Sequence, residues 1–151
     1  MTARRAWAPA LVLVLALAAA GCGGSKSLSG HRLRTEATRA CAVATQRLDS
    51  VSTPRLPSEG APFLRRGIAA LHSELTALAG LYPDGDLAEE FNRAQTATRR
   101  ELAALQSALK GLKAGNDPIV AFKTLQAQLG PLEKRATAAW LALQIPACVD
   151  T

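Results

Sequence analysis

Apolar residues recur at steps of three and four along most of the chain, a spacing that places them on one face of an α-helix. Four stretches show this pattern and are predicted to be helices: residues 32–51, 62–81, 87–114 and 118–145. In the second stretch the steps alternate regularly, as in the seam of a helix that packs against other helices. The seam residues are Leu64, Ile68, Leu71, Leu75 and Leu78.

Prolines, glycines and capping residues separate these stretches. Residues 52–62 contain three prolines and a glycine, so the chain is expected to turn there. Tyr-Pro-Asp-Gly at residues 82–85 predicts a second turn, followed by a capping box made by Asp86 and Glu89. Gly115 is expected to end the third helix, because glycine tolerates the left-handed backbone at that position.

The fourth stretch begins with a strong helix-start signal and contains one interruption. Asp117 is a typical N-cap residue, and Pro118 suits the first helical turn. Pro131 lies in the middle of the stretch, where proline removes one backbone hydrogen bond and crowds the preceding turn. The apolar phase continues across Pro131, so we expect a kink in one helix and not a break between two.

Four amphipathic helices with short connections predict an all-α protein, namely an up-and-down antiparallel four-helix bundle. The composition agrees, because 48% of the residues are hydrophobic and only 4% are aromatic, with few β-branched residues. A hydrophobic content this high excludes a disordered chain. The length of 151 residues leaves room for one such domain.

The first twenty-two residues have the layout of an export signal. Arg4 and Arg5 precede an apolar stretch over residues 8–20, which is shorter than the roughly 20 residues that a membrane-spanning helix needs. This stretch ends in Ala-Ala-Gly-Cys at residues 19–22, which resembles the bacterial lipobox. The resemblance implies cleavage before Cys22 and acylation of its thiol and its new amino group. An ordinary signal peptide with an unmodified cysteine is the alternative.

The predicted organisation has three parts: a signal peptide (residues 1–21), a flexible Gly/Ser-rich tether (residues 22–31) and the helical bundle domain (residues 32–151). Loss of Arg4 and Arg5 with the signal lowers the formal net charge from +6 to +4. Most of the remaining excess lies within residues 26–39, beside the lipid anchor, where basic residues are attracted to anionic head groups. The mature protein is therefore expected on the extracytoplasmic side of the cell membrane, held there by lipid.

With Cys22 assigned to lipid, Cys41 and Cys148 remain as an even pair in an exported chain. We predict a disulfide between them, because exported proteins meet an oxidising environment. In an antiparallel bundle the first helix begins at the end where the last helix finishes, which brings this pair together. The alternative is a metal site made by the two thiols with His31 and His72, although no familiar ligand spacing supports it.

No other pattern in the sequence carries recognisable chemistry. We expect no catalytic residue, no cofactor, no bound metal and no nucleic-acid partner, because the usual motifs for each are missing from the sequence. The aromatic residues are expected to fill the core, with a ligand pocket between helices as the alternative. These residues are Phe63, Tyr82, Phe91, Phe122 and Trp140. Residues 53–57 form either a plain connection or a binding loop at the end away from the anchor.

Three features together resemble small helical lipoproteins of high-GC Gram-positive bacteria. They are the lipobox followed by Gly-Gly-Ser at residues 23–25, Cys41 early in the first helix, and Trp-Leu-Ala-Leu at residues 140–143 with Cys148 after it. The resemblance implies a helical domain in the cell envelope, and it supplies no catalytic residue.

These observations predict a membrane-anchored, non-enzymatic cell-envelope lipoprotein that acts as a structural or protein-interaction module. Its expected partners are membrane lipid, through acylated Cys22, and an envelope protein at the distal surface of the bundle. The alternative is an extracytoplasmic carrier that binds a small apolar ligand between its helices. Alanine-rich seams bring helices close together, so they argue against a large cavity. The sequence carries no signal of an oligomeric state.

Overall fold

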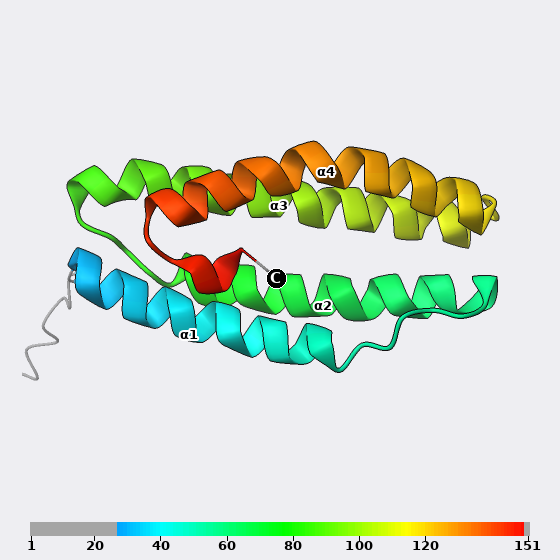
Figure 1. Cartoon of the computed structure of the whole chain (residues 1–151), viewed down its shortest axis with the longest axis horizontal. Coiled ribbons are helices and arrows are strands. Elements are labelled where there is room, and N and C mark those ends of the chain that lie inside the picture. Colours follow the sequence, from blue (N-terminus) through cyan, green and yellow to red (C-terminus); the bar gives the residue numbers. More distant parts are fainter. Residues whose placement is uncertain (1–26, 150–151) are drawn as a thin grey trace, which may run out of the picture.

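The structure is a computed structural model that describes residues 27–149, and these form a bundle of four long helices (Figure 1). The helices are α1 (Gly30–Asp49), α2 (Gly60–Ala79), α3 (Gly85–Lys113) and α4 (Pro118–Ala142), with short 3₁₀ helices η1 (Pro57–Glu59) and η2 (Pro146–Cys148). Successive long helices run in opposite directions, and the described part of the chain contains no β-strand. The predicted all-α, up-and-down four-helix bundle is confirmed.

The bundle has two distinct ends. At one end, which we call proximal, α1 begins and α4 finishes; the opposite end is distal (Figure 1). The main core cluster lies in the proximal half, and it joins residues of all four helices and the C-terminal tail. Its largest fully buried members are Leu33, Leu78, Phe91, Trp140, Leu143 and Ile145. A smaller cluster of Leu71, Leu75 and Leu102 joins α2 to α3 near the middle of the bundle.

The predicted starts of α1, α2 and α3 are about two residues too late. The capping box expected at Asp86 and Glu89 is wrong, because the N-cap position of α3 is Asp84 and its side chain makes no capping hydrogen bond. The backbone N–H of Asp84 donates instead to the carbonyl of Leu28 at 3.0 Å. This long-range bond keeps Asp84 extended, so the helix begins directly after it.

The same contact shortens the predicted tether. The backbone N–H of Leu28 donates to the carbonyl of Tyr82 at 2.6 Å, so the chain is already held against the α2–α3 turn at this residue. The helix α1 then begins at Gly30, two residues before the predicted domain boundary. The part of the tether before residue 27 lies outside the described residues.

The helix α4 behaves as predicted at its start and its middle. The carboxylate of Asp117 accepts a hydrogen bond from the backbone N–H of Val120 at 2.9 Å, which confirms the N-cap. The helix continues through Pro131 to Ala142 and is bowed in Figure 1, so it is one helix and not two. It ends three residues earlier than predicted, because Gln144 adopts a positive φ of 60° that turns the chain back.

The residues after α4, which we call the C-terminal tail (143–149), fold back between α4 and α1 (Figure 1). Leu143, Ile145 and Cys148 of the tail are buried. The side chain of Arg34 on α1 donates from Nε to the carbonyl of Leu143 at 3.0 Å. The tail thereby fills the proximal space between the first and last helices.

Candidate functional site

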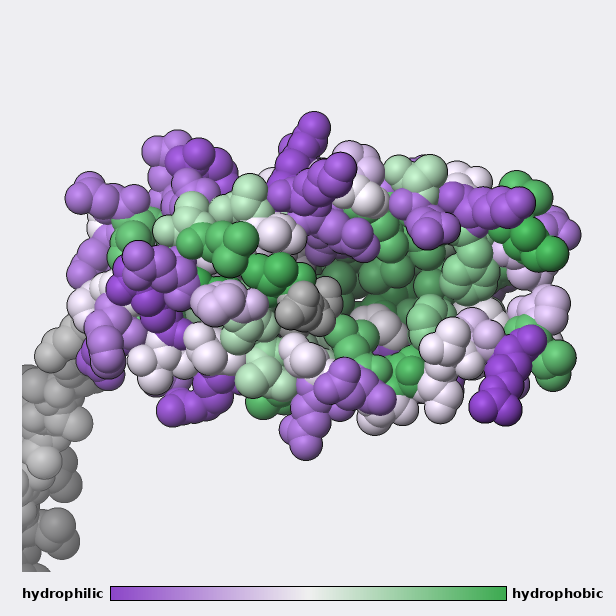
Figure 2. Space-filling model, viewed as in Figure 1, coloured by the Kyte–Doolittle hydropathy of each residue, from purple (hydrophilic) through white to green (hydrophobic). Residues whose placement is uncertain are grey.

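An open apolar groove runs along the distal half of the bundle. It has a volume of about 970 Å³ and is lined by the end of α1, residues 54–57, the first half of α2 and the first half of α4. Figure 2 shows it as a hollow of green, apolar surface between α4 and the α1–α2 pair. We call this feature the distal groove.

The distal groove follows from how the helices pair. The helix α4 packs mainly on α3, while α1 packs on α2, so the first and last helices do not close directly on each other. In the proximal half the C-terminal tail fills the space between them. Within residues 27–149 no segment fills the corresponding distal space, which is therefore left open.

Two glycines widen the distal groove. Gly67 on α2 and Gly130 on α4 both line it, and a Cβ atom added at either position would meet no heavy atom within 4 Å. Gly60 has the opposite role, because an added Cβ would lie 2.7 Å from the ring of Phe122. The start of α2 thus approaches α4 closely and closes the far end of the groove.

The aromatic residues divide between the core and the groove. Phe91 and Trp140 lie in the proximal core, with ring centroids 5.9 Å apart in an edge-to-face arrangement. Phe63 and Phe122 line the distal groove, with ring centroids 6.3 Å apart. Tyr82 is exposed. Phe91 and Trp140 are therefore core residues, as predicted, whereas Phe63 and Phe122 line an open groove; binding of a ligand there stays a prediction.

The loop at residues 53–57, for which a binding role was one of two expectations, also borders the groove. Four of its five residues, 54–57, line the groove, and Leu56 is 60% exposed. Glu59 holds the loop in shape, because its carboxylate accepts hydrogen bonds from the backbone N–H groups of Arg55 and Leu56. These bonds hold the pKa of Glu59 below its ordinary value.

Charged side chains lie at opposite ends of the distal groove. Arg55 and Lys123 line its distal part, and Glu133 lines the part nearest the middle of the bundle. Next to Glu133, the α3 residue Glu101 is buried at the contact between α3 and α4. Burial raises the pKa of the Glu101 carboxyl to about 7, and the charge of Glu133 adds to this effect.

The raised pKa of Glu101 makes stability depend on pH. Its reference pKa is 4.5, so the unfolded carboxyl ionises at lower pH than the folded one. The contribution of Glu101 to stability is therefore complete below about pH 4.5 and is lost as the pH rises through about 7. We expect Glu101→Gln to raise stability at about pH 8 by roughly 1–2 kcal/mol, after allowing for screening by solvent, and to leave it unchanged in acid.

Thermal melts at both pH values, followed by circular dichroism, measure this effect. Glu89→Gln is the matched control, because Glu89 is an exposed carboxylate on the same helix. An equal shift of the Glu101→Gln melting temperature in acid and in base would contradict the assigned role.

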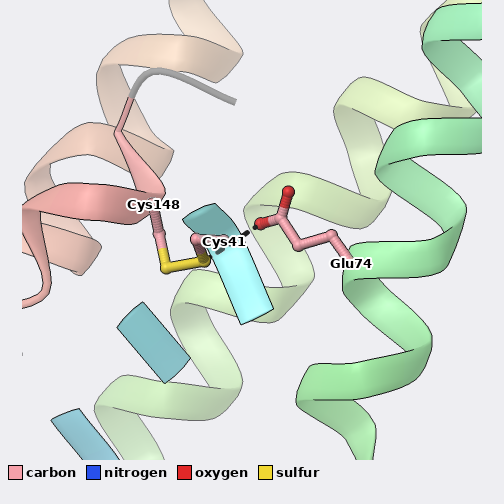
Figure 3. Close-up of side chains that lie close together, drawn as sticks. All are labelled: Cys41, Glu74 and Cys148. Carbon is pink, nitrogen blue, oxygen red and sulfur yellow. Dashed lines mark hydrogen bonds between the residues drawn. A yellow bond between two sulfur atoms is a disulfide. The ribbon is translucent and has the colours of Figure 1, made fainter. Parts of the chain in front are cut away.

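A second cluster of chemically active groups lies in the proximal core (Figure 3). Cys41 on α1 and Cys148 on η2 form a disulfide, with Cα atoms 5.0 Å apart, as predicted. Oε1 of Glu74 on α2 lies 3.5 Å from the sulfur of Cys41. Because a disulfide sulfur has no hydrogen, the proton of a hydrogen bond at this contact would come from the carboxyl group of Glu74.

The residue that lies beside the two cysteines is Glu74, and not His31 or His72 as the metal-site alternative required. Ligand atoms of Cys41, Glu74 and Cys148 lie within 4.8 Å of one another. Both of these histidines are exposed. In the disulfide form the two sulfur atoms have no thiolate to offer a metal, so the cluster is a structural cross-link.

The signal peptide and Cys22 lie outside the described residues. Among residues 27–149, no helix combines the length and the apolar character needed to cross a bilayer.

Three acidic residues that are prominent in the structure were not expected from the sequence: Glu74, Glu101 and Glu133. The helical pattern contains a signal for the first two. Glu74 lies between Leu71 and Leu78 on the apolar face of α2, and Glu101 precedes Leu102 on that of α3. A charged residue inside an apolar seam is the sign of a buried carboxyl group.

Comparisons with protein-family models, with curated sequences and with solved structures found no match to this chain.

Proposed function

We propose that this chain is a lipid-anchored, non-enzymatic binding protein of the cell envelope that holds a small apolar molecule in the distal groove. The carrying observation is the volume of the groove, about 970 Å³, lined mostly by leucine, proline and phenylalanine side chains. Ligand sites in proteins are typically apolar concavities of roughly 300–1,000 Å³. Alanine-rich seams argue against a large space inside the bundle. The groove lies beside these seams, between α1 and α4, where no described segment fills the distal space between the two helices.

The position of the groove supports this function in an anchored protein. The described chain begins five residues after Cys22 in sequence and enters the bundle at the proximal end, whereas the groove opens in the distal half (Figure 1). A lipid on Cys22 would therefore hold the protein at the membrane while the groove faces away from the attachment point.

Filling the groove tests the proposal. We expect Gly67→Leu and Gly130→Leu to place side chains in the empty space and to abolish co-purification of an apolar molecule. Both variants should also gain about 0.5–1 kcal/mol of stability, because leucine is a better helix former than glycine. Binding is then lost without unfolding. Native mass spectrometry of the full chain released from membranes measures bound molecules directly.

Gly85→Leu is the matched control, because Gly85 lies outside the groove and also has open space around it. This variant should keep the wild-type occupancy. Wild-type protein without any bound molecule, or groove-filled variants that carry as much as wild type, would overturn the proposal.

The anchor makes a separate prediction. Cells grown with labelled palmitate should incorporate the label into this chain, and Cys22→Ala should abolish the incorporation, because the thiol that receives the acyl group is removed. The neighbouring substitution Ser25→Ala should leave labelling unchanged. Persistent labelling of the Cys22→Ala chain would contradict lipidation at this residue.

A second function, docking of an envelope protein at the distal end, is favoured by one observation. Leu56, Ile119 and Val120 are about 60% exposed, and Leu56 of the loop and Ile119 at the start of α4 line the same distal part of the groove. Val120 does not line the groove, so Val120→Asp should weaken such docking while leaving a ligand in the groove, and co-purification of partner and ligand separates the two functions.

A further inference from the structure

The two ends of the distal groove differ in charge, because its cationic and anionic side chains lie at opposite ends. Lys123 and Glu133, both on α4, are ten residues apart, which is about 15 Å along a helix. Arg55 lines the same distal part as Lys123. Between the charged ends the walls are mainly apolar, with Leu64, Leu125 and Leu129 among them.

The two cationic side chains at the distal end have no ion-pair partner among the described residues. The ion pairs in this part of the chain join Arg39 to Glu36, and Arg93 to Glu89 and Glu90. The acidic residues nearest to Arg55 and Lys123 in sequence are Glu59 and Asp117, and their carboxylates accept hydrogen bonds from backbone N–H groups. The positive charges therefore remain available to a ligand.

The positive character of this end rests on Arg55 and Lys123. Both α2 and α4 begin there, but the acidic residues at their N-cap positions, Glu59 and Asp117, offset the partial positive charge of the helix N-termini. At the other end of the groove, the carboxylate of Glu133 would repel an anionic head group. Among the charged side chains that line the groove, the cations therefore lie at the distal end and the anion lies at the other end.

From this arrangement we infer that the ligand is a single-chain anionic amphiphile. Its carboxylate or phosphate head lies at Arg55 and Lys123, and its hydrocarbon chain lies along the apolar walls towards Glu133. The lined stretch of α4 from Ile119 to Glu133 is about 21 Å long, which suits an extended chain better than a compact ring system. This inference rests on the proposed function, since it names the class of molecule that the groove would hold.

Photo-crosslinking with three probes of equal chain length tests the inference. The full chain is reconstituted in phosphatidylcholine vesicles and irradiated with diazirine analogues of palmitate, of hexadecyl phosphate or of hexadecanol. Labelled residues are then mapped by mass spectrometry. We expect at least one anionic probe to label groove residues more strongly than the alcohol, and the stronger of the two anionic probes identifies the head group.

Charge and shape variants complete the test. Arg55→Ala with Lys123→Ala should reduce groove labelling by the anionic probe by at least about tenfold, because both charge-assisted contacts to the head group are lost, and should leave labelling by the alcohol unchanged. Arg93→Ala, which removes an exposed cation outside the groove, is the control. Gly130→Leu should abolish labelling of the groove by all probes.

The failures are distinguishable. Equal labelling of the groove by anionic and neutral probes, or no effect of the double substitution, would overturn the anionic head group while leaving apolar binding intact. Absence of groove labelling by every probe would overturn both the inference and the proposed function.

Discussion

Replacing Cys41 and Cys148 by alanine is expected to lower the free energy of unfolding by roughly 4–5 kcal/mol. The disulfide joins residues 107 positions apart, so it restricts the unfolded chain over most of the domain. It also holds the C-terminal tail against α1, and Leu143 and Ile145 of that tail are part of the core. Loss of the cross-link therefore affects both the unfolded ensemble and the packing of the proximal half.

Chemical denaturation of the wild type and the double variant measures this loss. Cys22→Ala is the control, since it makes the same substitution at a cysteine outside the described residues. Its unfolding free energy should equal that of the wild type. Labelling of Cys41 or Cys148 by a thiol reagent in the native, unreduced protein would contradict the disulfide.

Trp140→Ala is expected to cost about 3–5 kcal/mol, the range for removing a large aromatic side chain from a core. Trp140 is fully buried, with 0% exposure, and packs edge-to-face on Phe91. Its indole N–H donates to the hydroxyl of Thr98 at 3.3 Å, so its only polar atom is satisfied inside the protein. The cavity left by alanine would lie at the point where α3, α4 and the tail meet.

Two further substitutions serve as controls for the predicted loss of stability in Trp140→Ala. Leu141→Ala changes the adjacent, exposed residue and should alter stability by less than about 0.5 kcal/mol. Trp140→Phe keeps most of the apolar volume and should lose less than Trp140→Ala. Comparable unfolding free energies for Trp140→Ala and Leu141→Ala would show that the proximal core is not organised around this side chain.

The sequence predicted the helices well, because their signals are local. The steps of three and four identify the buried faces, and Leu33, Ala37 and Cys41 on α1 are buried as the pattern indicates. The helix caps were predicted less accurately than the helices. Asp117 caps α4 as predicted, whereas the cap expected at Asp86 was displaced by a backbone bond from Asp84 to Leu28, more than fifty residues away. A contact between distant residues leaves no trace in a local pattern.

The sequence indicated the groove only as an alternative, a pocket between helices, because an open groove depends on which helix faces are left uncovered. Leu125 and Leu129 belong to the same apolar stripe as Trp140, yet Trp140 is buried under the tail and Leu129 lines an open space. Periodicity identifies the stripe but does not say how far along it a neighbouring segment reaches. The seven-residue tail covers only the proximal part.

By itself, the sequence determined the helical periodicity, the antiparallel order that follows from short connections, and the pairing of Cys41 with Cys148. Each of these depends on local spacing or on chain topology. The tertiary structure decided where the core ends and the groove begins, which acidic residues are buried, and which cationic residues lie at the rim. These features depend on packing between segments far apart in the chain, and burial, the raised pKa of Glu101 and the open volume all arise from that packing.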